Sequence, residues 1–447
     1  MKKYNIIVIG AGESGTGAAV LARKKGIGVF VTDLGKIKND HKNVLSHYDI
    51  PFEEGKHTRD RILAADQIIK SPGIPDTAPM ITQIREKGIP VISEIEFASR
   101  YTNATKICIT GSNGKTTTAS LTQHILKKAG LDTCLAGNVG NSFAKELAHK
   151  DHAIFVLEIS SFQLDDMYEF RAEIAVLLNI TPDHLDRYDN RFTKYRDSKF
   201  RILNNQQKKD AFIYCFDDRN IREEISNRDI RARQFPFSIT RKIRGNGAFL
   251  DDNKIMIIND SNTFEMTIEM LALQGKHNIF NSMAAGITAR VLDIRKETIK
   301  ESLSDFQNIP HRLEYIANVM GIEFVNDSKA TNVNATWYAL ESMNKPVIWI
   351  AGGQDKGNDY TLLKGLVRKK VRAIVCLGLE NSKIHEAFAD DVERIIDTTS
   401  MEDTVNCAFH LGHKNDVVLL SPACASFDLF ENYADRGSQF KNAVNKL

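Results

Sequence analysis

A short run of small, polar and basic residues has the chemistry needed to hold the phosphates of a nucleoside triphosphate. Its glycines let the backbone turn N–H groups inward, Lys115 can reach the terminal phosphates and Thr116 can ligate Mg²⁺. Because Ile109 stands where the commonest form of this motif has a glycine, a solvated glycine-rich turn is the alternative. We expect an ATP-using enzyme whose phosphate loop consists of Thr110, Gly111, Ser112, Asn113, Gly114, Lys115, Thr116 and Thr117.

The segments around this loop predict a strand before it and a helix after it. Residues 106–109 are largely apolar, and Leu121, Ile125 and Leu126 fall on one face of a helix that Gly130 would end. Apolar runs alternate with helical patterns along the chain, which is typical of parallel sheets covered on both faces, so we predict an α/β fold. These runs span residues 6–9, 29–31, 107–109, 154–157, 174–178, 347–350, 374–377 and 417–420.

The length of 447 residues and two turn-rich breaks, near Ser93 and at Asn308–Pro310, predict three domains. The central domain is expected to be a phosphate-loop ATPase with a mostly parallel sheet. Shorter alternations from Arg241 to Thr267 predict a small antiparallel insert within it. The predicted domains are residues 1–93, 94–308 and 309–447.

The overall composition excludes several classes of protein. Lysine and arginine number 59 against 57 acidic residues, so the net charge of +2 gives no field suited to nucleic acid or a membrane surface. Six cysteines without CxxC spacing are typical of reduced thiols in a cytoplasmic protein. We expect no signal peptide and no membrane insertion, since residues 1–4 lead directly into a strand pattern and no apolar run approaches the length of a membrane span.

A second glycine motif opens the chain. Gly10, Gly12 and Gly15 form a GxGxxG pattern after an apolar run, and Asp33 ends the next run. This arrangement is typical of a Rossmann-like domain in which the turn holds a diphosphate and the acidic residue holds a ribose. A dinucleotide or a nucleotide sugar would fit equally well, and a glycine turn that only packs helix on strand is the structural alternative.

Four residues of the central segment suit an ATP-using site, although each has a simpler explanation. Glu158 ends an apolar run, where a carboxylate can ligate Mg²⁺ or cap the next helix. Asn138 can donate an amide to a substrate or stabilise its own turn, and a single histidine such as His184 is more often structural. Local rules predict that Lys199 is an ordinary surface lysine.

Seven segments occur together in the order found in one enzyme family. Over essentially its whole length the chain resembles the Mur ligases, and within them the members that add D-glutamate. It lacks the Asp-Asn-Pro-Arg box associated with members that add a diamino acid. The seven segments are Thr110–Thr118, Glu158–Gln163, Asp183–Tyr188, Pro310–Arg312, Asn326–Asn332, Gly352–Lys356 and Leu420–Asp428.

The resemblance implies ATP-dependent addition of D-glutamate to UDP-N-acetylmuramoyl-L-alanine through an acyl phosphate, in peptidoglycan precursor synthesis. It also implies a Rossmann-like C-terminal domain. The implied ATP contacts are the loop from Gly111 to Thr117 with Asn278, Asn281, Arg312 and Asp327. The implied catalytic residues are Lys115, His184, Lys199 and Lys329. Two Mg²⁺ ions would be held by Thr116, Glu158, His184 and a carbamate on Lys199. The UDP substrate would meet Ser14, Asp33, Gly73, Asn138 and His184, and D-glutamate would meet Thr331, Lys356, Ser426 and Tyr433.

Two departures and three alternatives accompany this interpretation. Tyr433 replaces a phenylalanine of some relatives, and Leu34–Lys36 shares little with the expected uridine loop. A nicotinamide oxidoreductase leaves the phosphate loop unused, a ligase that adds glutamate to folate does not explain the first domain, and a UDP-sugar sensor does not explain the set of catalytic residues. We expect a monomer with small-molecule partners that closes about hinges near Ser93 and Asn308.

Overall fold

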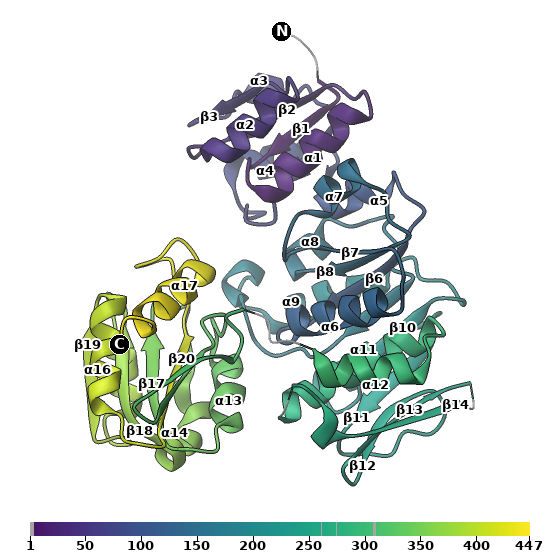
Figure 1. Cartoon of the computed structure of the whole chain (residues 1–447). Coiled ribbons are helices and arrows are strands. Elements are labelled where there is room, and N and C mark those ends of the chain that lie inside the picture. The colour runs from purple at the N-terminus through teal and green to yellow at the C-terminus, as the bar shows by residue number, and fades with distance from the viewer. Residues whose placement is uncertain (1–3, 261, 274, 307–309) are drawn as a thin grey trace. The chain divides into compact units, whose positions relative to one another are not determined.

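The computed structural model describes residues 4–260, 262–273, 275–306 and 310–447 (Figure 1). Within these residues the strands form sheets of five, nine and six strands. The first two sheets belong to one compact unit, which contains the described residues up to Ala272 and those from Asn278 to Phe306. The third sheet belongs to a second unit. The predicted break at Asn308 lies outside the described residues, so the three domain limits stay predictions.

The first sheet is parallel and has the strand order β3-β2-β1-β4-β5, which is that of Rossmann domains. Its strands are β1 (Ile6–Ile9), β2 (Val29–Asp33), β3 (Phe52–Glu54), β4 (Gln67–Lys70) and β5 (Val91–Ile92). The helices are α1 (Glu13–Lys24), α2 (Asn39–His47), α3 (Arg59–Ile62), α4 (Pro79–Glu86) and α5 (Glu94–Ser99). Ile7, Phe30 and Ile68 are buried in one core because their strands are covered on both faces.

The second sheet has the order β14-β13-β12-β11-β10-β9-β6-β8-β7, and its pairs from β7 to β12 are parallel. Its parallel strands are β6 (Thr105–Thr110), β7 (Thr133–Gly137), β8 (Ile154–Glu158), β9 (Ile174–Leu177), β10 (Ala211–Cys215) and β11 (Arg233–Ser238). The antiparallel segment was predicted correctly, but it extends this sheet at its edge. It consists of β12 (Gly247–Asp251), β13 (Lys254–Asn259) and β14 (Asn262–Thr267).

Helices and short 3₁₀ turns connect the strands of the second sheet. The longer helices are α6 (Lys115–Lys128), α7 (Phe143–His149), α9 (Phe192–Phe200), α10 (Arg219–Ile225), α11 (Lys276–Val291) and α12 (Lys296–Asp305). The shorter elements are α8 (Ser161–Asp165), η1 (Leu185–Tyr188), η2 (Arg201–Leu203) and η3 (Ile268–Met270). Gly130 follows α6 with φ +77°, so the predicted end of the phosphate-loop helix is confirmed.

The third sheet has the order β15-β16-β20-β17-β18-β19, with only the β15–β16 pair antiparallel among its described strands. Its strands are β15 (Glu314–Val319), β16 (Ile322–Asn326), β17 (Val347–Gly352), β18 (Val371–Leu377), β19 (Arg394–Thr398) and β20 (Val417–Ala423). The connecting elements are α13 (Val333–Ser342), η4 (Tyr360–Leu363), α14 (Lys364–Lys370), α15 (Ser382–Phe388), α16 (Met401–Leu411) and α17 (Tyr433–Val444). Leu340 and Phe388 pack on one face and Val405 and Phe440 on the other.

Every apolar run predicted to be a strand coincides with a strand, although Leu178 lies just beyond the end of β9, and this agreement confirms the α/β interpretation. In the part of the chain that the structure describes, no helix is both long and apolar enough to cross a bilayer.

Candidate active site

The phosphate loop connects β6 to α6 as the sequence predicts. Gly114 immediately precedes the helix with φ +85°, a left-handed conformation that favours glycine. A Cβ on Gly111 would lie 3.1 Å from the Cβ of Leu178, so the loop passes close to the end of β9. Asn179, which follows that strand, accepts from the Asn113 N–H at 2.8 Å and donates to the Asn113 carbonyl at 3.0 Å. The loop is therefore held in shape by protein groups.

Two lysines converge on one carbonyl of this loop. The Lys115 ammonium donates to the Gly111 oxygen at 2.8 Å, and the Lys199 ammonium, from α9, donates to the same oxygen at 2.9 Å. Lys199 is 2% exposed, so the local expectation of a surface lysine is wrong. Burial, followed by the positive charge of Lys115, holds the pKa of Lys199 well below its ordinary value. The loop thus brings two lysine side chains together where phosphates would bind, and one of them is held toward its neutral form.

Glu158 is the last residue of β8 and is buried beside the loop. Its carboxylate accepts from the Thr116 hydroxyl at 2.7 Å and from the Asn138 amide at 2.9 Å. The capping alternative is wrong, because the side chain of Ser160 accepts from Gln163 at the start of α8. A carboxylate next to a hydroxyl at a phosphate loop is an oxygen donor set that fits Mg²⁺.

His184 lies on the same unit in a left-handed backbone conformation, with φ +52°, just before η1. Its ring packs edge-on against Phe162 at 5.2 Å, and its Nε2 lies 3.7 Å from the Asp183 carboxylate. Such a conformation is uncommon for residues other than glycine and is often retained at functional sites. The sequence pattern alone did not predict this geometry.

Arg187 follows on η1 and links this region to the first domain. Its guanidinium donates to the carbonyls of Pro72, Gly73 and Ile74 at 3.2 to 3.3 Å. The same group lies 4.4 Å above the ring of Phe162. Sequence reasoning missed this role because the partners are more than a hundred residues away.

Two amides predicted to meet the nucleotide lie at the start of α11. Asn281 is 1% exposed and accepts from the Thr118 hydroxyl of α6 at 3.1 Å. It also donates to Asn278 at 3.1 Å. The structure therefore brings both amides beside the helix that follows the phosphate loop.

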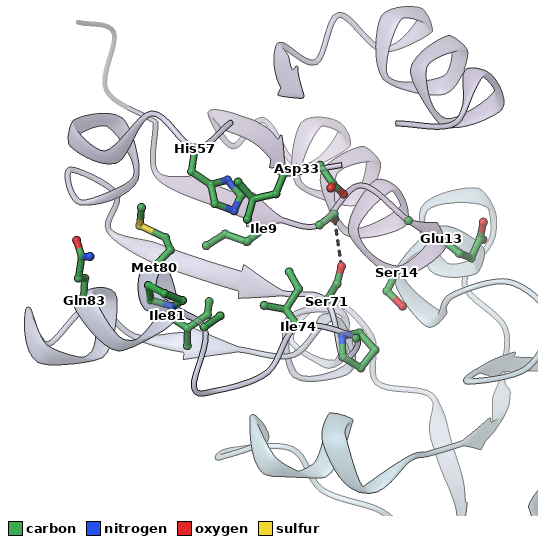
Figure 2. Close-up of a pocket in the computed structure, with 17 residues that line it drawn as sticks. Ile9, Glu13, Ser14, Asp33, His57, Ser71, Ile74, Met80, Ile81 and Gln83 are labelled. Carbon is green, nitrogen blue, oxygen red and sulfur yellow. Dashed lines mark hydrogen bonds between the residues drawn. The ribbon is translucent and has the colours of Figure 1, made fainter. Parts of the chain in front are cut away.

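The first domain contains a pocket of about 700 Å³ between its glycine turn and α4 (Figure 2). Ser14, Asp33 and Gly73 line it, as predicted, whereas Asn138 and His184 do not. The Asp33 carboxylate accepts from the N–H of Ala11 at 2.7 Å and from the N–H of Gly35 at 2.8 Å. Asp33 therefore shapes the turn as well as facing the pocket.

The residues predicted to meet D-glutamate and the acyl phosphate follow the carboxyl ends of three neighbouring strands of the third sheet. Asp327, Lys329 and Thr331 follow β16, Lys356 follows β17 and Ser426 follows β20. Such edges are where open α/β sheets bind ligands.

Two of these side chains have defined partners. Burial raises the pKa of Asp327 to about 7, although Arg312 and the Ser421 hydroxyl, which donates at 3.0 Å, lower it. The ammonium of Lys329 lies 5.1 Å above the ring of Tyr433, the first residue of α17. The Tyr433 ring is therefore placed against a lysine, and its proposed contact with D-glutamate stays a prediction.

Arg436 was missed by sequence reasoning. It is 1% exposed and donates to the backbone carbonyls of Ser328 and Cys424 at 2.9 and 3.2 Å. Burial lowers its pKa to about 10. This side chain joins the segments that follow β16 and β20, and its position on α17 gave no local signal.

Comparison with known families agrees with this geometry. Residues 4–93 match the Mur ligase MurD-like N-terminal domain, residues 109–289 the Mur ligase middle domain, and residues 311–424 the Mur ligase glutamate ligase domain. The chain belongs to the Mur ligase family. The family resemblance predicted from the seven sequence segments is thereby confirmed.

Mur ligases with high identity cover the whole chain. A relative from Porphyromonas gingivalis, called UDP-N-acetylmuramoylalanine--D-glutamate ligase, is 54% identical over 100% of this chain and 99% of its own. One of the same name from Bacteroides fragilis is 54% identical over 99% of each chain.

Solved Mur ligases share the fold at low identity. UDP-N-acetylmuramate-alanine ligase MurC from Thermotoga maritima superposes with a TM-score of 0.63 at 16% identity, covering 99% of both chains. MurF ligase from the same organism, solved in complex with ADP, superposes with a TM-score of 0.60 at 15% identity, covering 96% of this chain and 99% of its own. The three-domain α/β architecture is therefore that of Mur ligases.

Proposed function

We infer that this chain is an ATP-dependent ligase that adds D-glutamate to UDP-N-acetylmuramoyl-L-alanine in peptidoglycan precursor synthesis. The observation that carries the inference is identity above 50% over the full length to relatives named for that activity. The phosphate loop with two lysines on the Gly111 carbonyl adds a physical reason for phosphoryl transfer at this site.

The reaction has two steps. The substrate carboxylate attacks the γ-phosphorus of ATP, which releases ADP and forms an acyl phosphate. The amine of D-glutamate then attacks the acyl carbon, and the tetrahedral intermediate expels inorganic phosphate to leave an amide. Each step brings anionic groups together, so oriented positive charge lowers its barrier.

We propose that the N–H groups from Gly111 to Thr117 and the ammonium of Lys115 hold the ATP phosphates. The amides of Asn278 and Asn281 would contact the rest of the nucleotide. On the second unit, Arg312 and Asp327 would contribute to nucleotide binding, and Lys329 would offset the charge of the acyl phosphate. A Cβ at Gly111 would lie 3.1 Å from the Cβ of Leu178, so a larger residue would crowd the loop against the segment that follows β9.

For Mg²⁺, we propose Thr116 and Glu158 as ligands of one ion, with His184 and a carbamate on Lys199 at a second. Bound Mg²⁺ supplies positive charge that screens the phosphates and the attacking carboxylate. Lys199 fits carbamate formation because burial and Lys115 favour its neutral amine, the form that reacts with carbon dioxide. The carbamate would place an anion where the free lysine has a neutral amine.

Substrate contacts complete the proposal. We assign the UDP part to Ser14, Asp33 and Gly73 in the first-domain pocket. Asn138 and His184 would meet the muramoyl-alanine end. On the second unit, D-glutamate would be bound by Thr331, Lys356, Ser426 and Tyr433. We also propose a monomer located in the cytoplasm, where its six free thiols would stay reduced.

Phosphate release from ATP tests the function directly. The chain is incubated with Mg²⁺, UDP-N-acetylmuramoyl-L-alanine and, separately, D-glutamate, L-glutamate, L-lysine and meso-diaminopimelate. Release with D-glutamate alone is expected. Release with another amino acid would support the ligase chemistry with a different specificity. Release with none of them would favour a UDP-sugar sensor that has no ligase activity.

A further inference from the structure

His57 lines the first-domain pocket, and the proposed reaction gives this residue no role. Figure 2 shows its ring on the side of Met80 and Gln83, whereas Ser14 lies on the other side of the view. Its Nδ1 lies 2.7 Å from the hydroxyl of Thr32, a buried residue of β2. Nε2, on the opposite side of the ring, has no hydrogen-bond partner among the described residues.

The surroundings of Thr32 determine which ring nitrogen carries the proton. Besides His57, its hydroxyl faces the Glu53 carboxylate at 3.0 Å and the Lys56 carbonyl at 3.2 Å. Both of these oxygens can only accept, and the hydroxyl has one proton to donate. If that proton points to either oxygen, Nδ1 of His57 must donate to the hydroxyl. The neutral ring then has a bare Nε2 that can only accept.

The ionisation of the two neighbours supports this assignment. Burial raises the pKa of Glu53, but hydrogen bonds from Thr58 and Thr32 outweigh it and leave the pKa below its ordinary value. Burial lowers the pKa of His57, and the nearby charges of Glu53 and Asp33 only partly offset this. The pair is thus a carboxylate and a neutral imidazole near pH 7.

The two sides of the pocket suit different parts of a nucleotide. At the glycine turn, Gly12 caps α1 without a side-chain acceptor, so the first N–H groups of this helix suit a diphosphate. The side containing His57 adds Met80 and Ile81, which suit the apolar faces of a base. A base placed there would present its polar edge to the bare nitrogen of His57.

We propose that His57 selects the base of the nucleotide-linked substrate by accepting a hydrogen bond at Nε2 from a ring N–H. Uracil has such a donor at N3, between two carbonyls, whereas N3 of cytosine is itself an acceptor. The contact therefore favours uridine over cytidine nucleotides. This inference rests on the proposed function for the presence of a nucleotide in the pocket, but its test needs no catalysis.

Binding of UDP and CDP to the full chain, measured by calorimetry, tests the assignment. The unaltered protein is expected to prefer UDP by about ten-fold or more, since a site that pairs a polar group rejects an analogue that leaves it unpaired. In H57F the preference is expected to fall to about two-fold or less. H57N keeps a polar group for Thr32 but does not reach the base, so it should lose the preference as well. H47F, on the exposed end of α2, is the matched control and should keep it.

A merely structural histidine would give a different result. Its replacement would weaken UDP and CDP by the same factor, and an unchanged ratio would overturn the proposal. If the variants do not fold, UDP and N3-methyl-UDP are compared on the unaltered protein, where loss of the donor is expected to weaken binding about ten-fold. Equal binding would again overturn it. Loss of D-glutamate-dependent phosphate release with the nucleotide preference intact would contradict the proposed function alone.

Discussion

The two glycine-rich turns of the chain are built alike but differ in charge. Each follows the first strand of its sheet and opens a helix, and each is held by a side chain from the end of a neighbouring strand or just beyond it. In the first domain that side chain is the Asp33 carboxylate, bound to the Ala11 N–H. In the phosphate loop it is the Asn179 amide, and the side-chain nitrogens of Lys115 and Lys199 both donate to the Gly111 carbonyl.

This difference separates binding from chemistry. A diphosphate that is only held needs N–H donors and a shaped turn, and the first turn supplies both without a lysine on its backbone. A phosphoryl group that moves develops new negative charge, which the Lys115 ammonium at the second turn can stabilise. Local glycine spacing therefore predicts a phosphate site, while the cations around it indicate whether the phosphate reacts.

Replacing Lys199 should have the largest effect on activity. Lys199→Ala removes the buried amine and the proposed carbamate, so turnover is expected to fall about 10³-fold. Phosphate release with D-glutamate measures it, and high acetate should restore part of the activity by filling the gap with a carboxylate. Lys194→Ala, on the exposed side of α9, is the control. Failure of acetate in a folded variant would count against the carbamate.

Lys115→Ala tests the lysine that belongs to the phosphate loop itself. Loss of one oriented donor to the phosphates should lower kcat by about 10²-fold. Steady-state kinetics at saturating substrates measure this effect, with Lys127→Ala on the exposed face of α6 as control. Near-normal turnover would show that the lysine does not stabilise the transferring phosphoryl group.

Asp33→Asn should affect binding and leave the chemistry nearly unchanged. The amide has a single oxygen, so it can accept only one of the two N–H bonds that the carboxylate now accepts. We expect KM for the UDP substrate to rise about ten-fold and kcat to stay within about two-fold. Asp40→Asn, on exposed α2, is the control. A fall in kcat equal to the loss in kcat/KM would mean that the first turn also contributes to the chemistry.

Glu94→Gln should leave activity unchanged and affect stability only at high pH. Burial raises the folded-state pKa of Glu94 to about 8 from an ordinary 4.5, and its carboxyl oxygen accepts from the Ala144 N–H. The folded chain retains the proton that the unfolded chain loses, so stability falls as pH rises from about 4.5 to about 8.

Glutamine keeps the acceptor without titrating, and thermal melting measures the result. We expect Tm to rise by roughly 5 °C at pH 9 and to change by about 1 °C or less at pH 5. Glu86→Gln, which is exposed at the end of α4, should show neither effect. Equal shifts at both pH values would contradict the titration of a buried Glu94.

The sequence predicted features that depend on neighbouring residues. Strands such as β1 and β8 are continuous apolar runs, and glycine spacing marked both turns. Strand β11 was missed because Arg233, Gln234 and Pro236 interrupt its apolar pattern, although Phe235 and Phe237 are buried. The apolar-run criterion also omitted β10, although all five of its residues are buried.

Residues that act through distant partners could not be predicted locally. Glu96 was not noticed, yet its carboxylate accepts from the N–H groups of Tyr168, Glu169 and Phe170. These contacts fix α5 to the connection between α8 and β9. Lys199 was identified only through family resemblance, because helix position predicts nothing about its burial. The catalytic roles of individual residues still stay predictions.

Arg187 joins the wall of the first-domain pocket to the segment that contains His184. Three hydrogen bonds from this side chain hold the turn from Pro72 to Ile74, and His184 lies three residues before Arg187. A compound that displaces this turn would also displace η1, to which Arg187 belongs. It would misalign His184 without competing with ATP. Such an inhibitor would act by separating the Pro72–Ile74 turn from η1. Substitutions that give resistance would occur in either of these two segments.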